Sequence, residues 1–479
     1  MIINIIYFLS CALFPLFVLF SFNFLRHKQQ SNKHKTKLPP GDMGFPFIGE
    51  TMEFFNAQRR NKLYEEFVHP RITKHGKIFK TRIIGSPTVI VNGAEANKFL
   101  LSNEFKLVKS SWPSSSVHLM GKDSIMEKDG ERHRFLRGVI GTSLGYAGLE
   151  TLVPKLCNFV KLYLSQNWHG QEEISLYRST KVLTFSIVFE CLLGIKVEPG
   201  MIDTFERVLE GVFSPAIKFP GSKFSRAMKA RKEIEKMIVK VVREKRKEIE
   251  EGRVKREEDT MLMSKLVYGM IQEEITEKEI IDNVVLLVFA AHDTTSFAVA
   301  MTFKMLAQHP DCYGKVLQEH INIMRNKGRG ESLNVEDIKK MKYTWQVARE
   351  SMRLFPPIFG SFRKAITDIE YEGFTIPKGW KVLWTTYGTH YNEKYFKDPL
   401  TFNPSRFEEG MPQYAFVPFG GGPRLCAGYQ LAKLNILILV HYVVTQYDWS
   451  LLHLDETVTM DPLPFPSLGM PIRISPKHI

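Results

Sequence analysis

The chain has 479 residues, 44% of them hydrophobic and 24% charged, which is enough apolar material for a large folded core. Its 65 Lys and Arg against 51 Asp and Glu give a net charge of +14, but no basic groove with interleaved aromatic residues and no zinc-finger spacing accompanies this excess. Nucleic acid is therefore a poor partner, and a membrane surface or an acidic protein explains the charge better. Five scattered cysteines without a C-x-x-C pair exclude a disulfide framework and favour a reducing compartment.

The first 25 residues are almost continuously apolar, and a basic cluster from Arg26 to Lys37 follows them. At about 1.5 Å per residue, such a helix spans a hydrocarbon core of ~30 Å. A cleaved signal peptide is the alternative, but no Lys or Arg precedes the apolar run. We expect residues 1–25 to be an uncleaved transmembrane anchor, with the basic cluster and everything after it on the cytosolic side.

Residues 26–49 are basic and rich in proline and glycine, and residues 38–49 read LPPGDMGFPFIG. Proline fixes φ and glycine permits sharp turns, so this segment is a non-helical connector. It is either a stiff hinge that orients the body against the bilayer or an ordinary linker. Residues 50–479 contain no repeat and no long polar linker, and we expect one domain, mainly α with a minor β part.

The elements of this domain follow from periodicity and turn residues. A hairpin is expected at residues 83–91, around Gly85-Ser86-Pro87. Helices dominate from residue 149 to residue 353, including a run of mixed charge at 218–255. A second β region is expected at 369–383. A loop at 410–423 then precedes a helix at 429–444.

Residues 283–301 predict an apolar, largely buried helix with polar residues, His292 to Ser296, in its middle. Buried polar groups are costly unless they are satisfied or useful. The small residues Ala290 and Ala291 leave room for a ligand, and a Thr hydroxyl can bond to the carbonyl four residues earlier. A purely structural Thr cluster is the alternative.

Residues 419–428 read FGGGPRLCAG and place Cys426 in a glycine-rich loop just before a helix. A thiolate is a strong, soft iron ligand. Phe419 can shield its sulfur from water, and Arg424 supplies positive charge for a cofactor carboxylate. The loop glycines can turn backbone N–H groups toward the sulfur; they are Gly420, Gly421, Gly422 and Gly428. A buried structural cysteine is the alternative.

These motifs together resemble the cytochrome P-450 family of haem-thiolate monooxygenases. F-x-x-G-x-R-x-C-x-G resembles the family's haem-binding loop, and A-A-H-D-T-T resembles its A-G-x-D-T-T motif, with Ala291 where glycine is usual. Glu350-x-x-Arg353 and the later Arg406 resemble its buried Glu–Arg–Arg triad. The resemblance implies the cytochrome P-450 fold, with haem b between a long central helix and the loop that carries the cysteine.

The resemblance also implies roles for individual residues. Cys426 would ligate the haem iron with Phe419 beside the sulfur, and Thr294 and Asp293 would deliver the protons that oxygen activation consumes. Four side chains are assigned to the haem propionates: His133, Arg137, Arg363 and Arg424.

Electrons would come from NADPH through a flavoprotein, NADPH–cytochrome P-450 reductase, at the endoplasmic reticulum membrane. We expect Arg132 and Arg134 to face outward and, with Lys433, to form a basic patch that suits the acidic docking face of such a reductase. Ordinary surface charge is the alternative.

Five segments are implied to line the substrate pocket: 110–125, 213–224, 286–294, 354–362 and 464–468. Their apolar and aromatic content selects a bulky hydrophobic molecule by shape. Residues 217–224 could dip into the bilayer or be a plain exposed loop.

Stretches such as THYNEKYFKDP resemble the plant branch that oxidises cyclic terpenoids and sterol-like hormones, including triterpenoids and taxanes. The alternatives are a haem-thiolate isomerase or dehydratase acting on hydroperoxides without O2, and a non-catalytic haem sensor.

Overall fold

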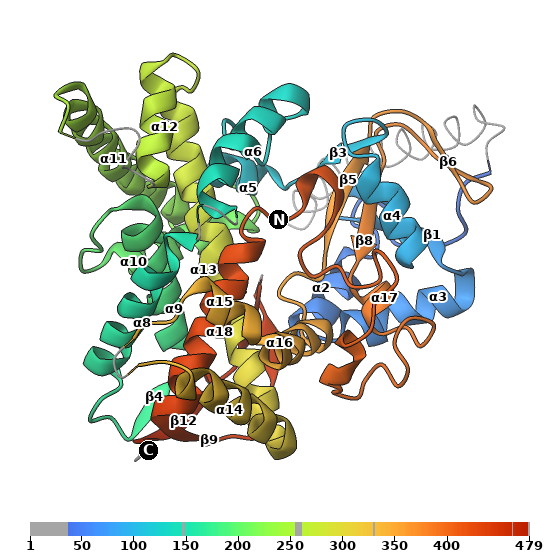
Figure 1. Cartoon of the computed structure of the whole chain (residues 1–479). Coiled ribbons are helices and arrows are strands. Elements are labelled where there is room, and N and C mark those ends of the chain that lie inside the picture. Colours follow the sequence, from blue (N-terminus) through green and yellow to red (C-terminus); the bar gives the residue numbers. More distant parts are fainter. Residues whose placement is uncertain are drawn as a thin grey trace, which may run out of the picture.

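A computed structural model of the chain describes residues 37–145, 148, 150–253, 261–328, 331–461 and 463–477. The anchor expected at residues 1–25 and the first part of the hinge lie outside the described residues. Figure 1 shows a helix-rich part and a sheet-rich part side by side, with the C-terminus at the foot of the helical part. The expectation of a mainly α protein with a minor β part is confirmed.

Helices make up most of the described chain. The α-helices are α2 (Thr51–Arg59), α3 (His69–His75), α4 (Ala94–Ser102), α5 (Ser114–Met120), α6 (Gly130–Leu144), α8 (Val153–Asn167), α9 (Leu176–Ser186), α10 (Met201–Val212), α11 (Lys223–Glu250), α12 (Leu262–Ile271), α13 (Glu277–Gln308), α14 (Pro310–Arg325), α15 (Val335–Lys340), α16 (Lys342–Leu354), α17 (Tyr387–His390) and α18 (Tyr429–Gln446). Shorter helical turns are π-helices η1 (Tyr64–Val68) and η2 (Ile187–Leu193) and 3-10 helices η3 (Pro404–Phe407) and η4 (Gly422–Arg424).

The strands form one five-stranded sheet and three small ones. They are β1 (Ile78–Ile83), β2 (Ser86–Val91), β3 (Val108–Ser110), β4 (Glu173–Ser175), β5 (Gly360–Ala365), β6 (Ile369–Tyr371), β7 (Phe374–Ile376), β8 (Lys381–Thr385), β9 (Tyr447–Leu451), β10 (Val458–Met460), β11 (Pro464–Pro466) and β12 (Pro471–Pro476). The large sheet has the order β1-β2-β8-β5-β3, and only its β2–β8 pair is parallel. The small sheets are β4-β12-β9, β10-β11 and β6-β7.

The hairpin expected near residue 85 is present, with a tighter turn than the sequence suggested. Ser86 and Pro87 belong to β2 and pair with Ile83 and Arg82, so the turn is Ile84-Gly85 alone. Proline is tolerated at the start of a strand, where a missing N–H costs least. The β region expected at 369–383 is confirmed as β6, β7 and β8.

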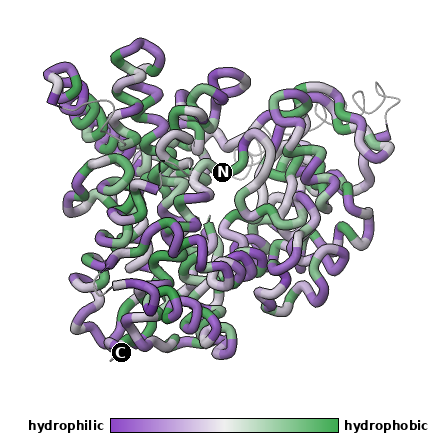
Figure 2. The backbone as a smooth tube through the Cα atoms, in the orientation of Figure 1, coloured by the Kyte–Doolittle hydropathy of each residue, from purple (hydrophilic) through white to green (hydrophobic). Residues whose placement is uncertain are grey.

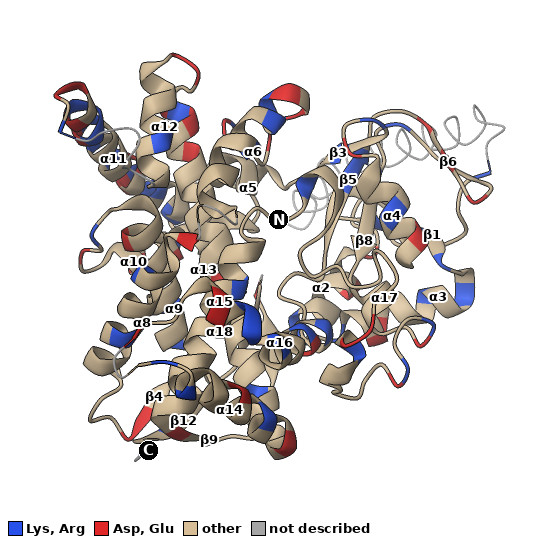
Figure 3. Ribbon diagram, in the orientation of Figure 1, with Lys and Arg blue, Asp and Glu red and all other residues tan. Residues whose placement is uncertain are grey.

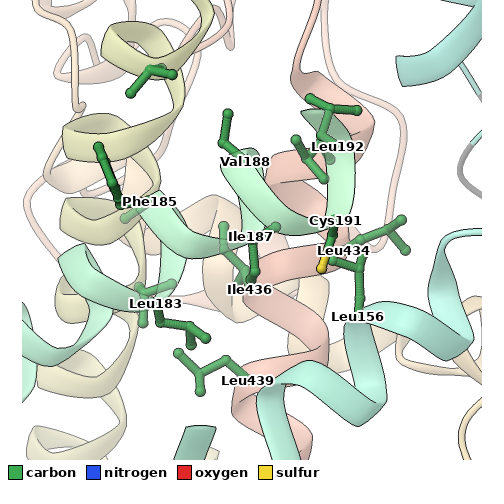
Figure 4. Packing of buried hydrophobic residues seen from close by; sticks show 14 of the residues in the cluster. Leu156, Leu183, Phe185, Ile187, Val188, Cys191, Leu192, Leu434, Ile436 and Leu439 are labelled. Atoms are coloured by element: carbon green, nitrogen blue, oxygen red, sulfur yellow. The ribbon is translucent and has the colours of Figure 1, made fainter. Parts of the chain in front are cut away.

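The main hydrophobic core lies among the helices and includes α8, α9, η2 and α18, as Figure 4 shows for Leu156, Phe185, Ile187 and Ile436. The large sheet separates two smaller clusters because successive side chains of a strand point to opposite faces. Val89 and Val91 of β2 join one cluster, while Ile90 joins the other. Figure 2 shows hydrophilic segments mainly around the outside of the molecule.

The long helix α13 passes through this core beside α18 (Figure 1). It begins with a capping box, in which Thr276 and Glu279 satisfy each other's backbone N–H groups, and it ends at Gln308, before the proline that starts α14. It is also the one described helix that is long and apolar enough to cross a membrane, but 67% of its apolar window is buried inside the protein. It is therefore the core helix that residues 283–301 predicted.

The mixed-charge run expected around residues 218–255 is α11, a helix that carries both basic and acidic residues along its length (Figure 3). Arg246–Glu250 and Lys240–Glu244 are i,i+4 ion pairs of the expected kind. Such exposed pairs keep the helix solvated and contribute little stability.

The described end of the hinge packs against the sheet. The carbonyl of Pro40 accepts the N–H of Lys80 in β1 at 2.7 Å, and the N–H of Glu50 donates to the carbonyl of Arg82 at 2.9 Å. The Glu50 carboxylate also pairs with Arg71 at 2.7 Å. Residues 40–50 therefore have a fixed path along β1, which favours the stiff hinge over a free linker.

Candidate active site

Cys426 lies between η4 and the first turn of α18, and its N–H donates to the carbonyl of Phe419 at 3.0 Å. The cysteine is accessible to water, yet protein surrounds it closely enough that burial raises the pKa of its thiol. The thiol is therefore partly enclosed by protein while the residue stays accessible. Backbone N–H groups of Gly428 and Tyr429 and the charge of Arg137 act in the opposite direction and favour the thiolate.

One glycine of this loop acts as expected, and another has a different purpose. Gly428 offers its N–H to the sulfur as predicted, but Gly422 faces α4. Gly422 has φ +63°, and a Cβ there would lie 2.0 Å from the carbonyl oxygen of Leu101. Any side chain would collide with the end of α4, so glycine is required for close packing at this point.

One face of α13 is open although the rest of the helix is buried. Ala290 is exposed and Thr294, one turn later, is partly exposed, while His292, Asp293 and Thr295 are buried. The Thr294 hydroxyl donates to the carbonyl of Ala290 at 2.6 Å, as the sequence allowed. An open face on an interior helix leaves space for a ligand beside Ala290 and Thr294.

Asp293 points away from that face into a chain of charged groups. Its carboxylate pairs with Lys181 of α9 at 3.0 Å, Lys181 pairs with Glu206 of α10 at 2.9 Å, and Glu206 pairs with the half-exposed Arg178 at 2.6 Å. His292 and Lys181 hold the pKa of Asp293 at about 2 although burial acts to raise it. The chain connects the middle of α13 with the protein surface.

His133 and Arg137 lie one turn apart on α6, as expected. Burial lowers the pKa of Arg137, and the Cys426 thiolate partly opposes this lowering, so the guanidinium lies within electrostatic reach of the sulfur. Burial, together with Arg424 and Arg137, lowers the pKa of His133 to about 4. His133 is therefore a neutral hydrogen-bonding group at pH 7.

Arg363 of β5 and Arg424 of η4 meet at one buried carboxylate, Glu104, with Nε–O distances of 2.6 and 2.7 Å. The sequence placed both arginines at one site but gave no sign of the acid between them. Nothing about Glu104 distinguishes it in sequence from the other 50 acidic residues, and only the pairing of β3 with β5 brings it to Arg363.

The Glu–Arg–Arg triad forms as the sequence predicted. Arg353 binds both carboxylate oxygens of Glu350, at 2.7 and 2.9 Å, and Arg406 binds one of them at 3.2 Å. The other donors of Arg353 reach the carbonyls of His390, Pro399 and Thr401. The triad thus ties α16 to the segment that leads into the cysteine loop.

The basic patch predicted beside the cysteine is wrong in part. Arg132 binds the buried Glu279 of α13 at 2.5 Å and does not face outward as a free charge. Lys433 is half-buried over the ring of Trp345, and burial lowers its pKa. Arg134 is exposed, as expected.

Four of the expected lining segments each contribute an aromatic side chain that packs against the main core. Trp112, Phe289, Phe355 and Phe465 are partly exposed there. Phe359 departs from the expectation, since it packs on Phe54 of α2 beneath the large sheet.

The donor set of this region suits haem. Among the described residues there is no group of three or more His, Cys, Asp or Glu that could hold a metal by itself, so an iron here needs ligands from a prosthetic group. An accessible Cys thiolate, an open helix face and guanidinium groups for carboxylates provide the three contacts that haem needs.

Comparison with known proteins agrees with this geometry. The family model described as "Cytochrome P450" matches residues 39–474. The chain belongs to the cytochrome P450 family. It is an oxidoreductase, and membership of this family implies haem and electrons from a redox partner.

The chain is 38% identical to the taxane 13-alpha-hydroxylase of Taxus cuspidata over 459 residues, 94% of each protein. It is 36% identical to the beta-amyrin 28-monooxygenase of Kalopanax septemlobus over 472 residues, 97% of this chain and 98% of the relative. A solved structure, retinoic acid bound cyanobacterial CYP120A1, matches with a TM-score of 0.83 and 29% identity and covers 93% of this chain and 100% of that one.

Proposed function

We propose that the protein is a membrane-anchored haem-thiolate monooxygenase that uses O2, with electrons from NADPH delivered by cytochrome P450 reductase, to hydroxylate or further oxidise a cyclic terpenoid. The observation that carries the proposal is the accessible Cys426 just before α18, the helix that packs against α13. The taxane and beta-amyrin relatives support a di- or triterpenoid substrate. The partly buried aromatic side chains Trp112, Phe289 and Phe465 of the expected lining segments suit such a rigid apolar molecule.

In this reading each residue has one task. Cys426 would provide the thiolate that ligates the haem iron, and the ring of Phe419 packs against that of Tyr429. Haem, when bound, supplies the oxygen chemistry. Thr294 presents a hydroxyl on the open face of α13, and Asp293 connects that face to the surface through Lys181 and Glu206.

The intact Thr294 and Asp293 favour a monooxygenase over an isomerase or a sensor, because only the monooxygenase consumes protons from this side. Arg137 and Arg363 are proposed to hold the propionates, together with the neutral His133, while the loop arginine Arg424 adds positive charge beside them.

The membrane anchor is proposed to be residues 1–25, with 26–49 as hinge and 50–479 as the haem domain in the cytosol at the endoplasmic reticulum. Apolar side chains on the described surface support a nearby bilayer. Phe45 is 80% exposed and Met52 is 64% exposed next to the hinge, and Ile217 and Phe219 are 61% and 68% exposed on the α10–α11 connection. Carbonate-resistant association with microsomes tests this anchor.

The first test is the carbon monoxide difference spectrum of the reduced full-length protein beside Cys426→Ser. A strongly red-shifted Soret band that the variant lacks is the expected result. Microsomes that contain the protein and a plant reductase are then supplied with beta-amyrin and with taxanes. NADPH-dependent formation of hydroxylated product supports the proposal, whereas haem binding without turnover on either class contradicts the terpenoid assignment.

A further inference from the structure

Glu104 is a buried carboxylate to which the family motifs assign no role. It follows α4 in the turn before β3, and its side chain is 1% exposed. One oxygen accepts Nε–H of Arg363 at 2.6 Å, and the other accepts Nε–H of Arg424 at 2.7 Å and the backbone N–H of Ser110 at 2.9 Å. Both arginines expected near the haem propionates therefore share one acid.

The two arginines differ in how many of their N–H donors remain without a protein acceptor. All five N–H donors of Arg424 are used: Glu104, the carbonyls of Ile125, Met126 and Lys128, and Asp129 accept them. Arg363 uses Nε on Glu104 and Nη1 on Ser361 and the Phe362 carbonyl. Its Nη2 has no hydrogen-bond partner in the part of the chain that the structure describes. Arg424 is thus a tie between loops, and Arg363 keeps donors for an added carboxylate.

The backbone beside Glu104 is held in an uncommon conformation. Phe105 has φ +69°, the left-handed region that non-glycine residues rarely adopt. Its ring lies 4.9 Å from the Arg424 guanidinium and 5.1 Å from the ring of His133. Such conformations persist where the surroundings fix them, and they gather at functional sites. The turn therefore directs Glu104 and Phe105 together at the propionate candidates.

Glu104 also offsets part of the positive charge of the neighbouring arginines. Arg363 and Arg424 are near enough to repel, since Arg424 adds to the lowering of the pKa of Arg363 that burial causes. With Arg137 the site has three buried or half-buried guanidinium groups, and Glu104 reduces their net charge to plus two. Asp129 lies on the solvent side, half exposed. Two positive charges match the two carboxylates that haem carries.

We propose that Glu104 is a positioning residue for haem: it orients Arg363 toward a propionate, holds Arg424 on the cysteine loop and sets the charge that the propionates meet. This inference depends on the proposed haem binding.

The test uses full-length Glu104→Gln, which keeps the shape and removes the charge, and Glu104→Asp, which keeps the charge and shortens the reach. We expect Glu104→Gln to shift the haem reduction potential to a more positive value, because a negative charge near the haem is lost. Haem transfer to apomyoglobin should become at least about tenfold faster, the equivalent of about 1.4 kcal/mol. Glu104→Asp should keep the wild-type potential while losing haem faster than wild type.

Three results would overturn the proposal: a wild-type potential together with a wild-type haem-transfer rate in Glu104→Gln, an equal shift of potential in both variants, or wild-type haem retention in Glu104→Asp. If Glu104→Gln does not fold, Glu104→Asp alone decides by the same criteria. Glu95→Gln is the matched control, because it removes a carboxylate from α4 that is 58% exposed and paired with Lys394. A wild-type protein without the red-shifted carbon monoxide band would instead contradict the proposed function itself.

Discussion

Two carboxylates in this molecule are each held between two arginines, and they do different work. Glu350 is fully buried, and every donor of its partner Arg353 is accepted by protein atoms. Glu104 is equally buried, but its partner Arg363 has a free Nη2 among the described residues. The same combination of one Glu and two Arg therefore makes a closed structural joint in one place and, by our proposal, a site that faces a ligand in the other. The difference lies in which donors remain unused.

Breaking the closed joint should have the largest effect. Glu350→Gln leaves the fully buried Arg353 without a countercharge, which costs about 3–5 kcal/mol. We expect little holoprotein on expression, and a urea midpoint for what remains that is well below wild type. Glu173→Gln, which loses an exposed pair with Arg473, is the control and should unfold like wild type. Wild-type stability of Glu350→Gln would refute the structural role of the triad.

A partly exposed and a fully buried threonine can also be compared on α13 alone. Thr294 and Thr302 make the same bond to the carbonyl four residues earlier, but Thr294 is partly exposed and Thr302 is fully buried. Thr294→Ala should reduce product formed per NADPH by about a hundredfold and release peroxide, the lower end of the range for loss of one proton-transfer group. Thr302→Ala should keep the coupling of wild type. Equal coupling in Thr294→Ala and wild type would show that the hydroxyl has no part in proton delivery.

Each arginine cluster includes a buried neutral histidine, so acid should weaken both. Burial lowers the pKa of His390, beside Arg353, to about 3 and that of His133 to about 4. Between pH 6.5 and 4 the unfolded chain gains these protons and the folded protein does not, so stability is full above pH 6.5 and falls below it. The slope should be about 1.4 kcal/mol per pH unit for each histidine.

For His390→Gln, the free energy of unfolding is measured with urea from pH 7 to pH 4.5. Its slope against pH should be smaller than that of wild type by the contribution of about one proton. An unchanged slope would mean that His390 is already protonated in the folded protein.

The smallest expected effect concerns the two neighbouring arginines of α6. Arg134 is exposed, whereas Arg132 is bound to Glu279. Arg134→Glu should raise the KM for reductase a few-fold at low salt, with the difference shrinking as salt screens the charge. Arg132→Gln should leave this KM unchanged and lower the thermal midpoint instead. A raised KM in Arg132→Gln with an unchanged KM in Arg134→Glu would place the docking surface on the other side of α6.

The sequence was sufficient to predict the features that depend on residues close together in the chain. Cys426, the Thr294 back-bond and the Glu350–Arg353 spacing are local patterns, and the structure contains all three. Lys181 and Glu104 were missed because each meets its partner only after distant segments pack: Lys181 lies on α9 while Asp293 is on α13. Arg132 was misjudged for the same reason, since its acid lies 147 residues further on.

The contact between Gly422 and Leu101 has a consequence for how the protein is made. The cysteine loop settles on α4, and Arg424 reaches back over 320 residues to Glu104. Contacts of such long range form late, because a long loop must close first. While the chain is being synthesised, α4 leaves the ribosome long before the cysteine loop that packs against it. We therefore expect cofactor capture to follow the end of synthesis, because the segments that would hold the cofactor lie near both ends of the folded domain.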